Sequence, residues 1–75
     1  MDTRYEEIGR LTARGADGEI YDVVELQIII TFPEGGEVKT SRGGVIYRLL
    51  DGRDVERVDG GTFKIVGSET LLKKA

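Results

Sequence analysis

The chain has no cysteine, no histidine and no tryptophan, and only one proline among its 75 residues. Without cysteine there is no disulfide, no thiolate metal site and no thiol nucleophile. Without histidine the commonest general base and the commonest metal ligand are missing. We therefore expect no cofactor, no bound metal and no catalytic residue, and we expect the protein not to be an enzyme.

Long hydrophobic runs and a strong excess of one charge are also missing. No apolar stretch approaches the ~20 residues that a membrane-spanning helix needs. The acidic start from Met1 to Glu7 does not resemble a secretory signal peptide. The net charge of −3 argues against unaided binding to a phosphate backbone. These features favour a cytoplasmic protein, and none of them indicates a membrane or a small-molecule substrate.

The residues that are present favour strands. Valine, isoleucine, threonine, tyrosine and phenylalanine make up a third of the chain, and such side chains fit a pleated, half-buried surface. Eleven glycines separate the apolar segments, and Asp-Gly steps are typical of tight hairpin turns. We expect an all-β fold of five to six short strands, a small single-domain antiparallel barrel or roll of the SH3-like or OB-like kind.

Turn signals divide the chain into its expected elements. Strands are predicted over residues 8–14, 19–32, 38–42, 45–50, 53–58 and 62–66, with Gly43-Gly44 as a break. Residues 1–7 are predicted to be frayed or to form a short helical turn. Two readings of residues 69–73 stay open: a strand that places Leu72 beside Phe63, or a terminal helical turn.

The longest predicted strand, Glu19 to Phe32, alternates with a period of two. Its even positions from Ile20 to Phe32 are almost all apolar, so we expect them to face the core, with Asp22 as the exception. A β-bulge near Asp22 or Val23 would repair that exception. The odd positions are then expected to face outward.

This orientation predicts a surface for a partner. Tyr21, Val23 and Ile29 would lie on the outer face of the long strand, and Ile46 and Arg48 on the outer face of another. The hypothesis is a non-enzymatic protein-binding module that docks a protein partner or a second copy, with homodimerisation as one form. The other reading is that residues 1–8 or the C-terminal tail cover Ile29.

Charge supports two alternative functions. Residues 1–37 carry nine acidic and three basic side chains, whereas residues 38–75 carry five acidic and eight basic ones. The acidic half suggests a small anti-CRISPR-like inhibitor, encoded by a phage or mobile element, that blocks a basic nucleic-acid-binding surface. A second alternative is weak nucleic-acid binding through Lys39, Arg42, Arg48, Arg53 and Arg57.

The C-terminal half has a recognisable pattern. Residues 47–52 read Tyr-Arg-Leu-Leu-Asp-Gly, and Asp59, Thr62-Phe63-Lys64-Ile65, Glu69 and Leu71 follow. Over residues 45–73 this pattern resembles a group of short bacterial and phage all-β proteins of unassigned function. The resemblance implies a small all-β fold and carries no catalytic residue.

Overall fold

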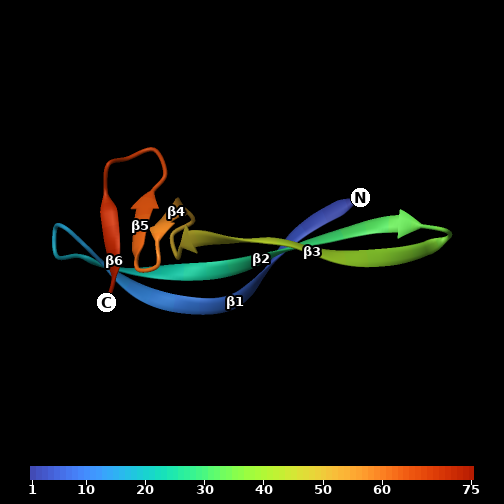
Figure 1. The fold of residues 1–75 in the computed structure, drawn as a ribbon, viewed down its shortest axis with the longest axis horizontal. Coiled ribbons are helices and arrows are strands. Elements are labelled where there is room, and N and C mark those ends of the chain that lie inside the picture. The colour runs from blue at the N-terminus through green and yellow to red at the C-terminus, as the bar shows by residue number, and fades with distance from the viewer.

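Six antiparallel strands account for nearly all of the chain in the computed structural model, which describes residues 1–75 (Figure 1). They are β1 (Asp2–Gly15), β2 (Ile20–Glu34), β3 (Glu37–Leu49), β4 (Asp54–Asp59), β5 (Thr62–Ile65) and β6 (Leu71–Lys74). Each strand pairs with the next, and β6 pairs back onto β1 to close a barrel. The predicted small antiparallel barrel, SH3-like or OB-like in kind, is confirmed.

The barrel occupies only one end of the molecule. β6 pairs with β1 only at Ala13–Gly15, and β4 pairs with β3 only at Tyr47 and Arg48. The remainder of β1, β2 and β3 continues as a three-stranded sheet, called here the arm (residues 2–7, 26–34 and 37–46; Figure 1). The radius of gyration is therefore 15.1 Å, whereas a compact chain of this length has ~11 Å.

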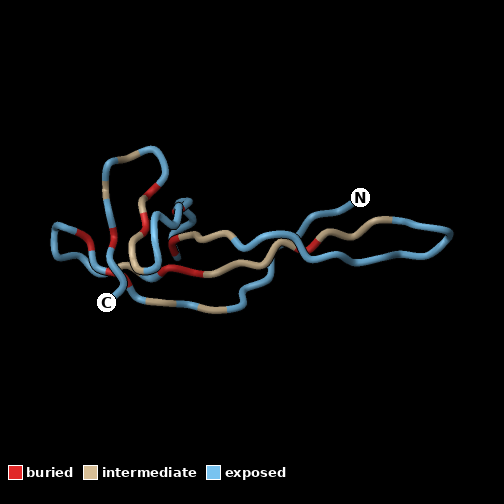
Figure 2. Tube along the Cα trace, in the orientation of Figure 1, coloured by how far each residue is buried: buried red, intermediate tan, exposed pale blue.

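The hydrophobic core lies inside the barrel end, where the buried residues concentrate, and the tip of the arm is exposed (Figure 2). Leu49 on β3, Val55 on β4 and Phe63 on β5 are all almost fully buried. The Tyr47 ring meets the Phe63 ring edge to face, with centroids 5.2 Å apart, a favoured aromatic geometry. The core also contains Ala13, Val23, Ile65 and Leu72.

β2 presents its odd positions to this core, so the predicted orientation of the strand is wrong. Val23 has no exposed surface, and Tyr21 packs against the core cluster, whereas Ile20 is 52% exposed. Directly opposite residues of an antiparallel pair share a face, and Val23 lies opposite Leu49, itself a core residue. Asp22 thus faces outward without any bulge in β2, and the bulge predicted near Asp22 or Val23 is also wrong.

Both register irregularities in the ladders of β2 lie on the strands that flank it, and a third lies on β4 between Arg57 and Asp59. On β1 the pairing shifts between Glu7 and Gly9. On β3 the extra residue falls at Gly43-Gly44, opposite Ile28, so the predicted strand break there is wrong and the strand continues through a bulge. The Gln27 amide donates to the Gly43 carbonyl oxygen at 2.7 Å. A Cβ on Gly43 would lie 3.3 Å from the Ile28 Cβ, so glycine allows the close approach.

Both ends of the chain are strands. Residues 2–7 are neither frayed nor helical, because Asp2 to Glu7 pair with Thr31 to Leu26. This segment therefore lies beside β2 and does not fold across it. At the other end the strand reading is confirmed: β6 places Leu72 opposite Phe63. Residues 2–7, which have little apolar content of their own, form a strand because they lie beside a hydrogen-bonding neighbour.

Carboxylates stabilise two of the turns. Asp51 accepts a hydrogen bond from the Arg53 backbone N–H at 3.0 Å and another from the Arg53 side chain at 2.9 Å. Asp59 accepts one from the Gly61 backbone N–H at 3.0 Å. Hydrogen bonds that the charged form accepts lower the pKa of each carboxyl: Arg53 is the main cause for Asp51, and Gly61, then Thr62, for Asp59.

The first prediction tests the core. Replacing Leu72, which has no exposed surface, with alanine should cost about 2–5 kcal/mol of unfolding free energy, because a cavity remains. A domain of this size has roughly 4–11 kcal/mol in total. The neighbouring Leu71 is 45% exposed, so Leu71→Ala is the matched control and should change little. Urea denaturation measures both, and equal losses would contradict this placement of the core.

The second prediction concerns acid stability. Because the folded-state pKa of Asp59 lies below its ordinary value of 3.8, its charge stabilises the fold above that value. That contribution is lost as the pH falls through the folded-state pKa. Asp59→Asn keeps an acceptor oxygen but not the charge, so its unfolding free energy should fall less than that of the wild type between pH 6 and pH 3. If the unfolding free energies of wild type and Asp59→Asn fall in parallel with pH, the charge of Asp59 does not stabilise the fold.

Candidate functional site

The outer face of the arm carries a continuous line of apolar side chains. Leu26, Ile28, Ile30 and Phe32 lie on the face of β2 opposite Val23. Tyr5 lies directly opposite Ile28 on β1, and Ile46 directly opposite Leu26 on β3. We call these six residues the apolar stripe: Tyr5, Leu26, Ile28, Ile30, Phe32 and Ile46.

Solvent reaches the whole apolar stripe. Tyr5 is 50% exposed, and the other five residues are partly buried, none of them fully. β4, β5 and β6 stay at the barrel end, so no strand packs across this side of the arm (Figure 1). The arm therefore carries a row of uncharged apolar side chains on a part of the sheet that the barrel does not cover. Exposed apolar patches of this kind mark interaction surfaces in soluble proteins.

Cations border the apolar stripe at the barrel end. Arg10 and Arg48 lie on either side of Val24, directly opposite it on β1 and β3. The Arg10 Nη2 atom lies 2.9 Å from the Glu7 Oε1 atom, and this hydrogen bond raises the pKa of Arg10. The Arg48 guanidinium pairs with Asp54 at 3.1 Å and lies 5.4 Å from the centroid of the Tyr5 ring, which it approaches across β2.

Carboxylates border the apolar stripe at the tip of the arm. Glu34 and Glu37 lie opposite each other across the hairpin that joins β2 to β3. Glu37 pairs with Lys39 at 3.0 Å, whereas Glu34 makes no ion pair. Glu7, directly opposite Leu26, and Lys39, directly opposite Phe32, lie on the same face. Each end of the apolar stripe therefore carries charges of both signs, and Glu34 is the carboxylate among them that no cation of the chain engages.

The residues predicted as a partner surface separate onto two faces. Tyr21, Val23 and Ile29 face the interior side of β2, and Val23 and Ile29 are 0% and 2% exposed. The predicted exposure of Val23 and Ile29 is wrong, whereas Tyr21 is partly exposed. Ile46 and Arg48 do lie on the outer side, with the apolar stripe. The structure thus brings Ile46 and Arg48 together, buries Val23 and Ile29, and leaves Tyr21 partly exposed on the opposite face.

Ile29 is buried although it lies in the arm. Its direct neighbours on the two flanking strands are Arg4 and Arg42, and long arginine side chains cover apolar neighbours with their aliphatic stems. The sequence suggested two ways of covering Ile29: a terminal segment folded across it, or a partner. Neither is found. The N-terminal segment supplies an edge strand beside Ile29, and no partner is needed to seal it.

The sequence carries no local signal for the inward face of β2. In the barrel part of the strand, the even positions and the odd positions each hold two apolar residues and one acidic residue: Ile20, Asp22 and Val24 against Tyr21, Val23 and Glu25. Only the apolar residues of the arm, from Leu26 to Phe32, distinguish the two sets, and they favour the even positions. The more apolar face of the strand is therefore its exposed one.

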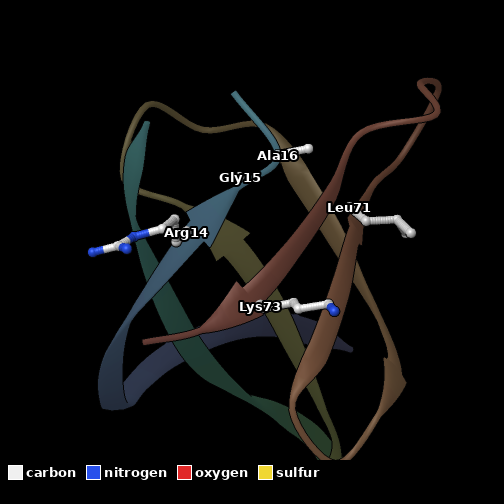
Figure 3. A pocket seen from close by; sticks show the side chains of 5 residues that line it. All are labelled: Arg14, Gly15, Ala16, Leu71 and Lys73. Atoms are coloured by element: carbon white, nitrogen blue, oxygen red, sulfur yellow. The ribbon is translucent and has the colours of Figure 1, made fainter. Parts of the chain in front are cut away.

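A shallow hollow at the barrel end is the other candidate. Its volume is about 350 Å³, and Arg14, Gly15, Ala16, Leu71 and Lys73 line it (Figure 3). The Arg14 side chain points away from Leu71 and Lys73 (Figure 3), so the two cations do not converge on a common point. The hollow lacks the convergent polar groups of a ligand site.

The charges do not gather into a metal or phosphate site. No group of three or more acidic side chains is placed to hold a metal ion. Of the five cations considered for nucleic acid, Lys39, Arg48 and Arg53 are engaged by carboxylates at 3.0, 3.1 and 2.8 Å. Such pairing leaves less positive charge free for phosphates.

Comparison of the chain with protein families, with curated proteins and with solved structures found no match. The structure has no helix with the length and apolar character needed to cross a membrane. The chain is placed in the class of small antiparallel β-barrel proteins by its own strand order, and the features of its surface carry the functional argument.

Proposed function

We propose that the protein is a non-enzymatic protein-binding module whose docking surface is the apolar stripe of the arm. The observation that carries the proposal is the orientation of β2: a central strand buries Val23 on one face and leaves Ile28, Ile30 and Phe32 accessible on the other. The arm adds little to the barrel core, so its length is better explained by contact with another molecule.

The make-up of this surface resembles that of protein interfaces. An apolar centre with a charged border is the usual arrangement, and here Arg10, Arg48, Glu34 and Glu37 surround uncharged side chains. Tyr5 and Arg48, which form a cation–π pair at 5.4 Å, are of the residue types that dominate binding energy at interfaces. A row of isoleucines on a flat sheet is also prone to aggregate when nothing covers it.

The acidic-inhibitor alternative receives less support. It requires the carboxylates of the first half to act together on a basic partner. Glu7 and Glu37 are instead engaged by Arg10 and Lys39, which lowers the local field. The binding surface proposed here depends on apolar contact and not on net charge.

The third prediction tests the docking surface. Ile30→Glu should weaken association through the arm by more than about 100-fold, because binding would bury an unpaired carboxylate. Val38→Glu is the matched control: Val38 is 73% exposed and lies opposite Pro33, on the other face of the arm. Analytical ultracentrifugation and capture of proteins on the immobilised chain measure association.

Both variants must keep the barrel, which circular dichroism and urea denaturation check. If Ile30→Glu unfolds, Ile30→Thr keeps the β-branched shape and removes one apolar group, and it should weaken association to a smaller degree. The proposal is wrong if wild type, Ile30→Glu and Val38→Glu behave alike in both association assays.

A further inference from the structure

We infer that the partner of the apolar stripe is a second copy of the same chain, seated face to face with the two arms antiparallel. This inference rests on the proposed function and names the molecule that docks. It follows from the place of Glu34, a carboxylate without an ion pair at the tip of the arm, relative to Arg10 and Arg48 at the barrel end.

The spacing of Val24 and Glu34 along β2 defines this arrangement. Val24, which lies between Arg10 and Arg48, and Glu34, at the tip, are equally far from Ile29 along the strand. A two-fold axis lying between the sheets at the level of Ile29 therefore places each Glu34 over the other copy's Val24. Glu34 makes no ion pair within its own chain, and this arrangement brings it between two guanidinium groups.

The same axis aligns the apolar side chains. Ile28 lies opposite the second copy's Ile30, and Leu26 opposite the second copy's Phe32, so the stripe meets itself along its length. Two sheets that pack face to face lie ~10 Å apart with strands nearly aligned. Each contact occurs twice, as a two-fold interface requires.

The parallel alternative is disfavoured by charge. If the two arms pointed the same way, Glu34 would meet Glu34, and Arg10 and Arg48 would meet the same cations of the second copy. Like charges brought together at an interface suppress that arrangement. The antiparallel arrangement, which places Glu34 over Arg10 and Arg48, avoids these contacts.

The available area fits a weak dimer. From Val24 to Glu34 the outer face of β2 is ~34 Å long. The sheet is three strands wide, ~14 Å, as far as Thr31, where β1 ends, and two strands wide, ~10 Å, beyond it. Two copies would therefore bury about 900 Å² in total, an area found in weak and transient complexes. The exposed area of the chain is 5133 Å², whereas a compact monomer of this mass exposes ~4,600 Å², so the arm provides the excess surface.

The experiment is a charge exchange on the full chain, read by sedimentation equilibrium across a concentration series. Wild type should dimerise. Glu34→Arg should raise the dimer dissociation constant about tenfold, since the repulsion is introduced twice. The double variant Glu34→Arg with Arg10→Glu should recover most of the lost affinity. Glu6→Arg is the control for charge, because Glu6 lies on the other face of the arm, opposite Gln27, and it should dimerise like wild type.

A second measurement uses the absence of cysteine from the chain. Ile28→Cys and Ile30→Cys proteins, mixed after one is enlarged by a fused tag, should form a disulfide-linked hybrid under mild oxidation. Thr40→Cys lies on the outer edge strand and opposite Thr31 on the other face, and it should not cross-link. Cross-linking through Thr40 with none between positions 28 and 30 would indicate edge pairing and would overturn the inference.

The remaining outcomes separate this inference from the proposed function. A wild type that stays monomeric, yet captures another protein in a manner that Ile30→Glu abolishes, overturns the second copy and leaves the docking surface standing. A dimer that Ile30→Glu does not weaken overturns both. A dimer that Ile30→Glu weakens but that ignores Glu34→Arg, or that the double variant does not restore, overturns the antiparallel arrangement.

Discussion

The hydrogen-bond ladders on both sides of β2 are the interaction on which the rest of the structure depends. β1 and β3 pair with this strand along almost its whole length, from Ile20 to Glu34. Because one strand serves both the barrel and the arm, its pleat also determines which side chains enter the core. A change of phase by one residue would exchange the two faces everywhere along it.

The two bulges beside β2 let β1, β2 and β3 form both the barrel and the arm. Each adds a residue on a strand that flanks β2, at Ile8 and at Gly43-Gly44, where the barrel gives way to the arm. Bulges increase the local twist and bend a strand, while β2 itself stays regular. Closing β6 onto β1 beyond this point seals the core, and the arm remains a sheet with two open edges. The proposed docking surface is a consequence of that division.

The proposed site lies on the face of β2 that does not contact the barrel core. A barrel of this size needs few residues for its core, and Val23, Leu49, Phe63 and Leu72 supply much of it. The isoleucines of the arm contribute little to that core, because they lie beyond the closed end of the barrel. In the proposed dimer, Arg10 and Arg48 of one copy would meet Glu34 of the other, which would give the contact a direction.

The sequence by itself determined the all-β class, the turns at Asp-Gly steps and the extended segment through Ile29. Local rules suffice there, because turn chemistry and β propensity act over a few residues. Tertiary structure alone decided which face of β2 is inside and that residues 2–7 form a strand. Both faces of β2 are apolar in places, so alternation cannot choose between them. The choice follows from where β4, β5 and β6 close the barrel, and these contacts join residues far apart in the chain.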